Sequence, residues 1–236
     1  MDARVSEKVS GFPFGIGAYS APEAARLLKT SPAKIRRWLS GYSYRRDGLR
    51  RDVPPFWESE LAEFDEALEL GFRDLVELRF VKAFLDAGLG LKTIRTCLAR
   101  AQEIVGETHA FSTRRFRTDG ETIFLKSLRE SGEAELLDLK KGQYAFGRIV
   151  ERTFKDLDLE DEAVVRWRPF HGRDSIVIDP ERSFGKPITA ASGVPTAALA
   201  DAVEAEGSVK RVAYFFEVAP EIVRDAVRFE QDLKAA

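Results

Sequence analysis

The sequence predicts an α+β protein in three parts. These are an N-terminal pair of short helices with a β-hairpin and a helical extension (residues 1–107), a central small antiparallel β region (108–180) and a C-terminal three-helix bundle (181–236). Three observations lead to this prediction. Helix-capping signals precede apolar residues at helical spacing near both ends. Asp-Gly dipeptides, which favour hairpin turns, stand beside β-rich runs. With 44% hydrophobic residues, the 236-residue chain can form one large core or several small ones.

The two N-terminal helices begin at clear capping signals. Ser20 is followed three residues later by Glu23, which is the capping-box spacing, and the apolar residues of a short helix follow. Ser31 then precedes Pro32, a residue favoured in the first turn, and starts a second helix. The sequence therefore predicts two short helices that meet across a tight turn.

The second helix has a buried stripe and a cationic outer side. Each residue advances a helix by about 100°, so an inward Ile35, Trp38 and Leu39 leave Arg37 pointing outward, with Lys34 and Arg36 on its flanks. We interpret Trp38 as a core residue rather than a base-stacking platform. The outward cations make this helix a candidate for the major groove of DNA.

A basic hairpin follows the second helix. Asp47-Gly48 predicts a type I′ turn between arms that carry four arginines, and Ser20 to Arg51 holds nine Lys or Arg against two acidic residues, a net charge of +7. Charge, helix spacing and hairpin together predict a winged helix-turn-helix that binds duplex DNA, although a basic run can also be only a solvated face. Arg37 would read a base edge, and the other cations would contact phosphate. The candidate DNA-binding residues are Ser20, Ser31, Lys34, Arg36, Arg37, Tyr42, Tyr44, Arg45, Arg46, Arg50 and Arg51.

Three amphipathic helices are expected in the extension, over Glu58–Leu70, Phe72–Ala87 and Leu91–Val105. Cys97 fits the buried stripe of the third, so we interpret it as a core residue rather than a reactive thiol. With Cys97, His109 and His171 as the available Cys and His side chains, the sequence predicts no zinc site, and we expect no cofactor.

The central region is predicted to be mostly antiparallel β. Asp119-Gly120 marks a further hairpin turn, and some helical content is expected between Leu128 and Leu139. The expected β-rich runs are Phe111–Arg117, Thr122–Leu125, Gln143–Phe154, Val164–Arg168 and Ser175–Ile178.

The C-terminal part returns to helical spacing, with helices expected over Thr196–Ala205, Ser208–Glu217 and Pro220–Leu233. From Ala200 to Ala236 there are five basic and eight acidic residues, a net charge of −3 that disfavours phosphate and favours a protein partner. A purely structural or dimerising bundle is the alternative. The candidate partner-binding residues are Val209, Val212, Tyr214, Phe215, Phe216, Arg228 and Phe229.

Residues Ala18 to Arg51, followed by Glu77 to Arg95, resemble the MerR-like winged-helix pattern over about 90 residues. That pattern has a Tyr-Ser opening, an Ala-Ala-Leu-Leu helix, an Arg-Trp recognition helix and a later helix pair with Gly and Leu-Lys-x-Ile. MerR-type regulators usually end in a long dimerising coiled coil with an effector domain. This sequence has no such heptad run, so operator untwisting driven by an effector is not implied.

Two C-terminal motifs, Ile178 to Ile188 and Gly193 to Thr196, are followed by three helices and Ala226 to Glu230, and together they resemble the domain-of-unknown-function family 433. That family is similar to VapB-type antitoxins and is often encoded beside a PIN-like toxin nuclease. Ser192-Gly193-Val194 stands where the common form has Gly-Thr-Arg, so no role is carried over for that arginine. The resemblance implies an autorepressing antitoxin that holds a toxin through its C-terminal module.

An enzyme would have to use carboxylates in one polar loop (Asp156, Asp158, Glu160, Asp161 and Glu162) or His171 beside Arg173 and Asp174. No second acidic cluster pairs with that loop to hold Mg²⁺, so we expect no catalysis.

No membrane-length apolar run is present, and Met1 to Ser10 lacks the apolar stretch of a secretory signal, so a cytoplasmic location is expected. One short module covers little of a DNA groove, and two-fold operators match two-fold proteins, which predicts a homodimer. Our hypothesis is a sequence-specific transcriptional regulator of the antitoxin type. The alternative is a DNA-binding regulator without a toxin, whose middle and C-terminal regions mediate dimerisation or another protein contact.

Overall fold

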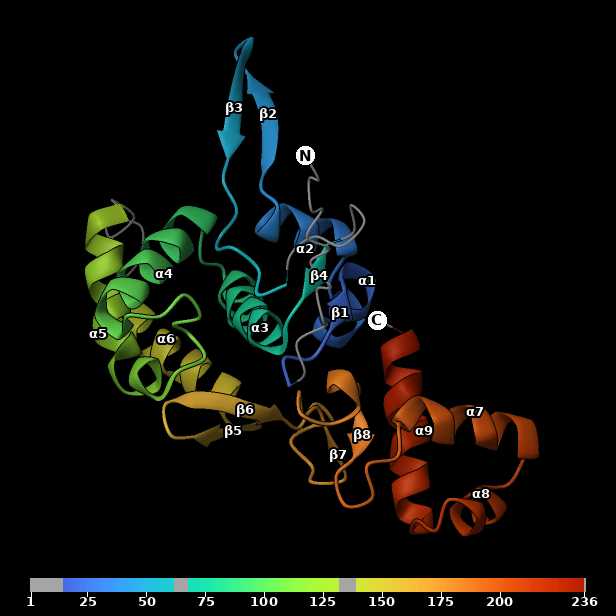
Figure 1. The fold of residues 1–236 in the computed structure, drawn as a ribbon. Coiled ribbons are helices and arrows are strands. Elements are labelled where there is room, and N and C mark those ends of the chain that lie inside the picture. Colours follow the sequence, from blue (N-terminus) through green and yellow to red (C-terminus); the bar gives the residue numbers. More distant parts are fainter. Residues whose placement is uncertain (1–14, 62–67, 132–138, 236) are drawn as a thin grey trace, which may run out of the picture.

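The computed structural model describes residues 15–61, 68–131 and 139–235. Helices and four two-stranded antiparallel sheets make up this part of the chain, so the predicted α+β class is confirmed. In Figure 1, the first hairpin projects from the body of the molecule, and the last three helices form a lobe away from it. None of the helices in the described ranges is long and apolar enough to cross a membrane.

The N-terminal helix pair has the predicted form, because both capping serines make their bonds. The helix pair is followed by a hairpin whose five-residue arms pair antiparallel from Tyr42↔Val53 to Arg46↔Leu49. The elements are β1 (Tyr19–Ser20), α1 (Ala21–Leu28), α2 (Pro32–Leu39), β2 (Tyr42–Arg46) and β3 (Leu49–Val53).

The extension contains two of the three expected helices, α3 (Phe72–Asp86) and α4 (Leu91–Val105), and Cys97 is buried in α4 as predicted. The helix expected over Glu58–Leu70 is wrong where the chain is described. Residues 58–61 are not helical, and β4 (Glu69–Leu70) pairs with β1. Residues 62–67, with Phe64, lie outside the described residues.

The middle of the chain differs most from the sequence prediction. Phe111–Arg117, Thr122–Leu125 and Gln143–Phe154 were expected as strands, but two helices cover most of these residues, and Asp119-Gly120 lies inside the first of them. The expected strands near residues 164–168 and 175–178 are confirmed. The elements are α5 (Arg114–Ser131), α6 (Leu139–Phe154), β5 (Leu157–Glu160), β6 (Ala163–Trp167), β7 (Ile176–Val177), a 3₁₀ turn (Ser183–Gly185) and β8 (Ile188–Thr189).

Buried phenylalanines explain why α5 and α6 are helices. Phe146, Val150 and Phe154 are buried, whereas Arg148 and Arg152, which would share their face in a strand, are exposed, and this pattern fits a helix and not a strand. Phe146 stacks on Phe124 of α5, with ring centroids 4.0 Å apart, and on Phe84 of α3 at 5.0 Å. Burial of these large rings between three helices outweighs the β propensity of the aromatic residues.

The last three helices match their predictions, as α7 (Thr196–Glu206), α8 (Val209–Phe215) and α9 (Pro220–Lys234). One continuous core extends from Tyr19 to Ile178, whereas these helices share a smaller core of their own. The members of the smaller core are Leu199, Val212, Ala213, Val223 and Ala226.

The segment that leads into the lobe is attached to β1 and α1. The buried Tyr19 hydroxyl donates to the Gly185 carbonyl oxygen at 2.7 Å, and Lys186 pairs with Glu23, the capping residue of α1. Gly185 has a φ of +75°, and a Cβ there would collide with the Tyr19 hydroxyl, so this junction requires glycine. This segment is therefore held against β1 and α1, and Leu27 of α1 packs against the cluster that contains Phe229 of α9.

Candidate functional site

Both capping serines use their hydroxyl groups inside the chain. The Ser20 hydroxyl accepts from the Glu23 backbone N–H, while the Glu23 carboxylate accepts from the Ser20 N–H, so the predicted capping box is confirmed. The Ser31 hydroxyl accepts from the Lys34 N–H at 3.3 Å. These bonds fix the orientation of α1 and α2, and both serines act first as helix caps.

The outer side of α2 is cationic, as its spacing predicts. Ile35, Trp38 and Leu39 are buried, which leaves Lys34, Arg36 and Arg37 exposed. The Arg37 guanidinium lies 4.4 Å from the centre of the Tyr42 ring, a cation–π contact. This contact joins the helix to the first residue of the hairpin and holds Arg37 in place.

The hairpin turn has the expected geometry, because Asp47 and Gly48 both have positive φ, at 54° and 76°. Side chains alternate between the two faces of a strand pair. Tyr42, Tyr44, Arg46 and Arg51 therefore share one face, which we call the Tyr42 face. Their exposure and their continuity with Arg37 make this face the natural extension of the outer side of α2.

The opposite face of the hairpin carries Arg45 and Arg50 with Ser43 and Asp52. Arg50 donates to the Asp52 carboxylate and to the Ser43 hydroxyl, both at 3.0 Å, so its charge is partly neutralised. The Ser43 hydroxyl also donates to Asp52, and this hydrogen bond together with that from Arg50 lowers the pKa of Asp52 below its ordinary value. The four arginines are thus not equivalent, a difference that the sequence did not indicate.

The Arg95 side chain of α4 holds the end of the hairpin. The Arg95 guanidinium donates to the carbonyl oxygens of Pro54 and Pro55 at 2.7 and 3.0 Å, and it lies 4.2 Å from the centre of the Phe56 ring. The Phe56 N–H donates to the Trp38 carbonyl oxygen at 2.8 Å. Arg95 therefore joins the extension to the hairpin exit, and about 40 intervening residues hide this contact in the sequence.

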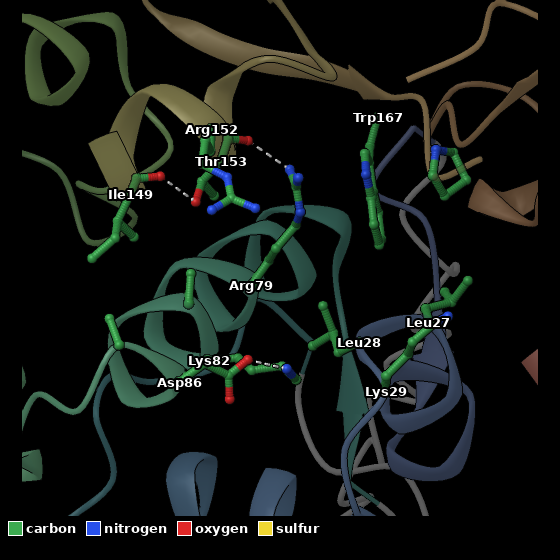
Figure 2. Close-up of a pocket in the computed structure, with 13 residues that line it drawn as sticks. Leu27, Leu28, Lys29, Arg79, Lys82, Asp86, Ile149, Arg152, Thr153 and Trp167 are labelled. Atoms are coloured by element: carbon green, nitrogen blue, oxygen red, sulfur yellow. Dashed lines mark hydrogen bonds and ion pairs between the residues drawn. The ribbon is translucent and has the colours of Figure 1, made fainter. Parts of the chain in front are cut away.

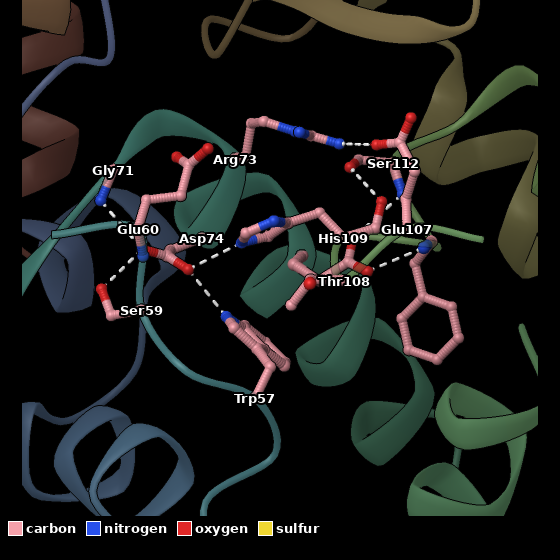
Figure 3. A network of polar contacts seen from close by, with 12 residues as sticks. Trp57, Ser59, Glu60, Gly71, Arg73, Asp74, Glu107, Thr108, His109 and Ser112 are labelled. Atoms are coloured by element: carbon pink, nitrogen blue, oxygen red, sulfur yellow. Dashed lines mark hydrogen bonds and ion pairs between the residues drawn. The ribbon is translucent and has the colours of Figure 1, made fainter. Parts of the chain in front are cut away.

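Asp74 is the centre of a buried polar network, which Figure 3 shows. Its carboxylate accepts from the Trp57 indole N–H at 2.7 Å, from the Ser59 hydroxyl at 2.7 Å and from the Gly71 N–H at 3.0 Å. The His109 Nε2 lies 2.8 Å away on the same carboxylate. The network joins the segment after the hairpin and the loop before α5 to the start of α3.

Charge coupling shifts the pKa values in this network. Burial alone would raise the pKa of Asp74, but the His109 hydrogen bond and charge bring it below the ordinary value. Burial would lower the pKa of His109, but Asp74 and Glu77 raise it. Burial raises the pKa of Glu77 to about 7, although its oxygens accept from the backbone N–H groups of Phe111 and Ser112.

One group of possible metal ligands in the described residues has the spacing of a metal site: Glu60, Asp74 and His109 each place a ligand atom within 4.8 Å of the others. Trp57, Ser59 and Gly71 already donate hydrogen bonds to both Asp74 oxygens. The arrangement therefore fits a hydrogen-bonded structural centre better than a metal centre.

Three of the five carboxylates considered for catalysis form ion pairs with arginines. Asp156 accepts from Arg79 at 2.5 Å and from the Trp167 indole at 3.2 Å. Asp158 pairs with Arg168, and Glu160 pairs with Arg166. Asp161 and Glu162 are exposed on the β5–β6 turn. His171 is also exposed, and its Nε2 lies 3.9 Å from the Asp232 carboxylate.

The predicted partner-binding residues separate into core and surface. Val212 and Phe229 are buried, at 0% and 3% exposed, so their prediction as direct contact residues is corrected. They are apolar residues on the inner sides of α8 and α9. Tyr214 and Phe215 are 81% and 59% exposed, with ring centroids 6.0 Å apart, and we call them the aromatic pair. Val209 and Phe216 are half-buried, and Arg228 is exposed.

Comparisons with known proteins extend over nearly the whole chain. No family model matches. The chain is 28% identical over 226 residues to a protein of Mycobacterium tuberculosis (strain ATCC 25618 / H37Rv) named "Putative antitoxin VapB45", covering 91% of this chain and 94% of that protein. The fold of this chain is similar to the crystal structure of Rv2018 from Mycobacterium tuberculosis, with a TM-score of 0.72 and 25% identity; the similarity covers 92% of this chain and 100% of that chain. The similarity therefore includes more than one part of the molecule.

Proposed function

We propose that the protein is an antitoxin-type regulator, which binds operator DNA through its N-terminal helix pair and hairpin and a protein toxin through its C-terminal lobe. The single observation that carries DNA binding is the continuous cationic surface from α2 through Arg37 and Tyr42 to the Tyr42 face of the hairpin. The antitoxin assignment draws on the similarity to the protein named VapB45.

On the DNA side, α2 enters the major groove with Arg37 toward a base edge. Lys34 and Arg36 flank it and contact phosphate. The hairpin then extends along the adjacent backbone or minor groove, with Arg46 and Arg51 toward DNA because they share a face with Tyr42. A homodimer places two such units on a two-fold operator.

On the toxin side, the aromatic pair is the anchor. Large exposed aromatic side chains are unusual on a solvated surface and are enriched where proteins bind each other. The lobe is acidic overall, which suits a partner with a basic groove, such as the PIN-like nuclease that the family resemblance implies. The protein acts in this proposal by binding, in the cytoplasm, and performs no catalysis.

The test compares two variants of the full chain. One carries Arg37→Glu, and the other carries Tyr214→Ser with Phe215→Ser. Fluorescence anisotropy measures binding to duplex DNA from upstream of the protein's own gene, and co-purification measures capture of the product of the neighbouring reading frame. We expect the first variant to lose DNA binding and keep the partner, and the second to do the reverse.

Two results would count against the proposal. If wild-type protein binds the upstream duplex no better than a scrambled duplex, the regulator assignment is wrong. If the aromatic-pair variant keeps its partner but becomes monomeric by light scattering, the lobe serves dimerisation, and the toxin-free alternative replaces the antitoxin assignment.

A further inference from the structure

A cavity of about 540 Å³ lies where four elements meet, behind the proposed DNA surface. The cavity is lined by the end of α1 with its cap residue Lys29, by α3, by α6 and by Trp167 of β6 (Figure 2). Pro169 completes the lining beside Trp167. Its volume is within the range of pockets that hold small molecules, about 300–1,000 Å³. The DNA and partner surfaces described above do not use it.

One part of the cavity wall is apolar and rigid. Leu27, Leu28, Ile149 and the Trp167 ring line it. The Trp167 indole N–H donates to Asp156 at 3.2 Å, and the Arg79 guanidinium lies 5.0 Å from the ring centre. The indole is therefore held in one orientation, as a wall against which a planar apolar group can pack.

The cavity wall carries more positive than negative charge. Arg79 donates hydrogen bonds to the Asp156 carboxylate and to the Thr153 carbonyl oxygen. Lys82 forms an ion pair with Asp86, the one acidic residue in the lining. The lining has two further cations, Lys29 of the α1 cap and Arg152 of α6, both exposed. Among the described residues neither has an acidic partner within ion-pair distance. The cavity thus joins an apolar wall to uncompensated positive charge.

We propose that this cavity binds a small amphipathic anion: a planar apolar body packs against Trp167, Leu27 and Leu28, and its carboxylate, sulfonate or phosphate group meets Arg152 and Lys29. An uncharged ligand would leave the two cations unpaired, and a small inorganic anion would leave the apolar wall in contact with water. Only a ligand with both features satisfies both parts of the wall.

The cavity has a neighbour on the DNA side. A second hollow, lined by Lys34 and Arg37, shares three lining residues with the cavity: Lys29, Lys82 and Asp86. An anion bound behind α1 would add negative charge near the outer side of α2 and weaken attraction to phosphate. This consequence rests on the proposed function, whereas binding of the anion does not.

The probe is 8-anilino-1-naphthalenesulfonate, titrated into the full chain and followed by its fluorescence and by quenching of tryptophan emission. Its uncharged counterpart is N-phenyl-1-naphthylamine, which has the same apolar body without the sulfonate. We expect one saturable site per chain for the anion and at least about tenfold weaker binding of the neutral compound, which corresponds to roughly 1.4 kcal/mol.

The cavity variant carries Lys29→Glu with Arg152→Glu, and we expect it to bind the anion at least tenfold more weakly. Its control carries Lys126→Glu with Lys155→Glu, the same change in charge at exposed positions outside the cavity. We expect the control to bind within twofold of wild type. Circular dichroism checks that both variants fold. Should the cavity variant misfold, Ala87→Phe, a change at an exposed lining residue, narrows the cavity and serves instead.

Several results would overturn the inference. These are equal binding of the two probes, equal loss in the cavity and control variants, or no saturable binding to wild type. A signal that disappears in the Tyr214→Ser, Phe215→Ser variant places the probe on the aromatic pair, and the cavity assignment is then wrong. Because no DNA is present in the titration, failure of the proposed regulator function does not affect the result.

Discussion

Helices α2 and α8, at the two ends of the molecule, begin in the same way and present different surfaces. The Ser31 hydroxyl caps α2 by accepting from the Lys34 N–H, and the Ser208 hydroxyl caps α8 by accepting from the Arg211 N–H. Caps and a buried stripe are thus sufficient to place a helix at either end. What differs is the solvent-facing side: α2 presents cations and no large exposed aromatic residue, whereas α8 presents the aromatic pair beside Lys210 and Arg211.

The two ends also differ in how they are supported. The N-terminal pair belongs to the continuous core that reaches Ile178, and the Asp74 network fastens the segment after its hairpin. The C-terminal lobe has its own small core; Leu27 of α1 packs against the cluster that contains Phe229 of α9, and Tyr19 and Glu23 hold the segment that leads into the lobe. A substitution that disrupts the Asp74 network should therefore leave the C-terminal lobe folded, and a substitution in the core of the lobe should leave the N-terminal pair folded. Both expectations can be tested.

The largest effect is expected from Asp74→Ala. This change removes the acceptor of five hydrogen bonds, from Trp57, Ser59, the Glu60 and Gly71 backbone N–H groups and His109, and leaves the buried His109 without its carboxylate partner, which costs about 3–5 kcal/mol. Hydrogen exchange should show lost protection in α3 and at the N-terminal pair, with α7–α9 protected as in wild type. Equal loss of protection in the lobe would show that the two ends share one cooperative unit.

Most of the N-terminal pair could be predicted from sequence because its signals are local. The two serine caps lie next to the helices they start, and α4 has the predicted bounds. The same turn signal succeeded at Asp47-Gly48 and failed at Asp119-Gly120, because Gly120 is buried in α5 and packs below the Phe116 ring. A local turn preference loses where distant aromatic residues compete for the same segment.

The candidate site was only partly predictable. The cations of α2 follow from helical spacing within eight residues, so their exposure could be derived. The separation of Arg50 from Arg51 follows from a local contact, because Arg50 and Asp52 lie two residues apart on one face of β3. The Arg95 hydrogen bonds instead join residues about 40 positions apart. Contacts of that kind depend on tertiary packing, which periodicity does not encode.

The second prediction concerns DNA specificity. Arg37→Ala should reduce discrimination between the operator and unrelated duplex by about 1–3 kcal/mol, because a base-edge contact is lost. Arg51→Ala should weaken binding to both duplexes alike and lower the salt slope by roughly one unit. Arg50→Ala is the matched control with a smaller effect, since Arg50 is already paired with Asp52. Anisotropy titrations at several salt concentrations measure all three, and equal behaviour of Arg37 and Arg51 would contradict separate roles in readout and phosphate contact.

The third prediction separates core from surface within the lobe. Val212→Ala opens a cavity in the smaller core and should cost roughly 1–3 kcal/mol of folding free energy. Tyr214→Ser removes a side chain that is 81% exposed and should change stability by no more than about 0.5 kcal/mol. Urea unfolding followed by hydrogen exchange in α7–α9 measures both. A destabilisation from Tyr214→Ser as large as that from Val212→Ala would mean that the aromatic pair is structural.

The fourth and smallest effect is a pH dependence confined to the N-terminal support. The pKa of His109 is higher in the folded chain than its ordinary value, so its stabilising contribution is complete below about pH 6.5 and is lost as the pH rises through the folded pKa. His109→Gln removes this titration, so the stability difference between wild type and variant should shrink as the pH is raised from 6 to 8.5. His171→Gln is the control, because His171 is exposed and lies outside the Asp74 network, so the pH dependence assigned to His109 should remain in this variant. Thermal unfolding across this range measures both, and parallel profiles for the two variants would remove His109 from the support of the N-terminal pair.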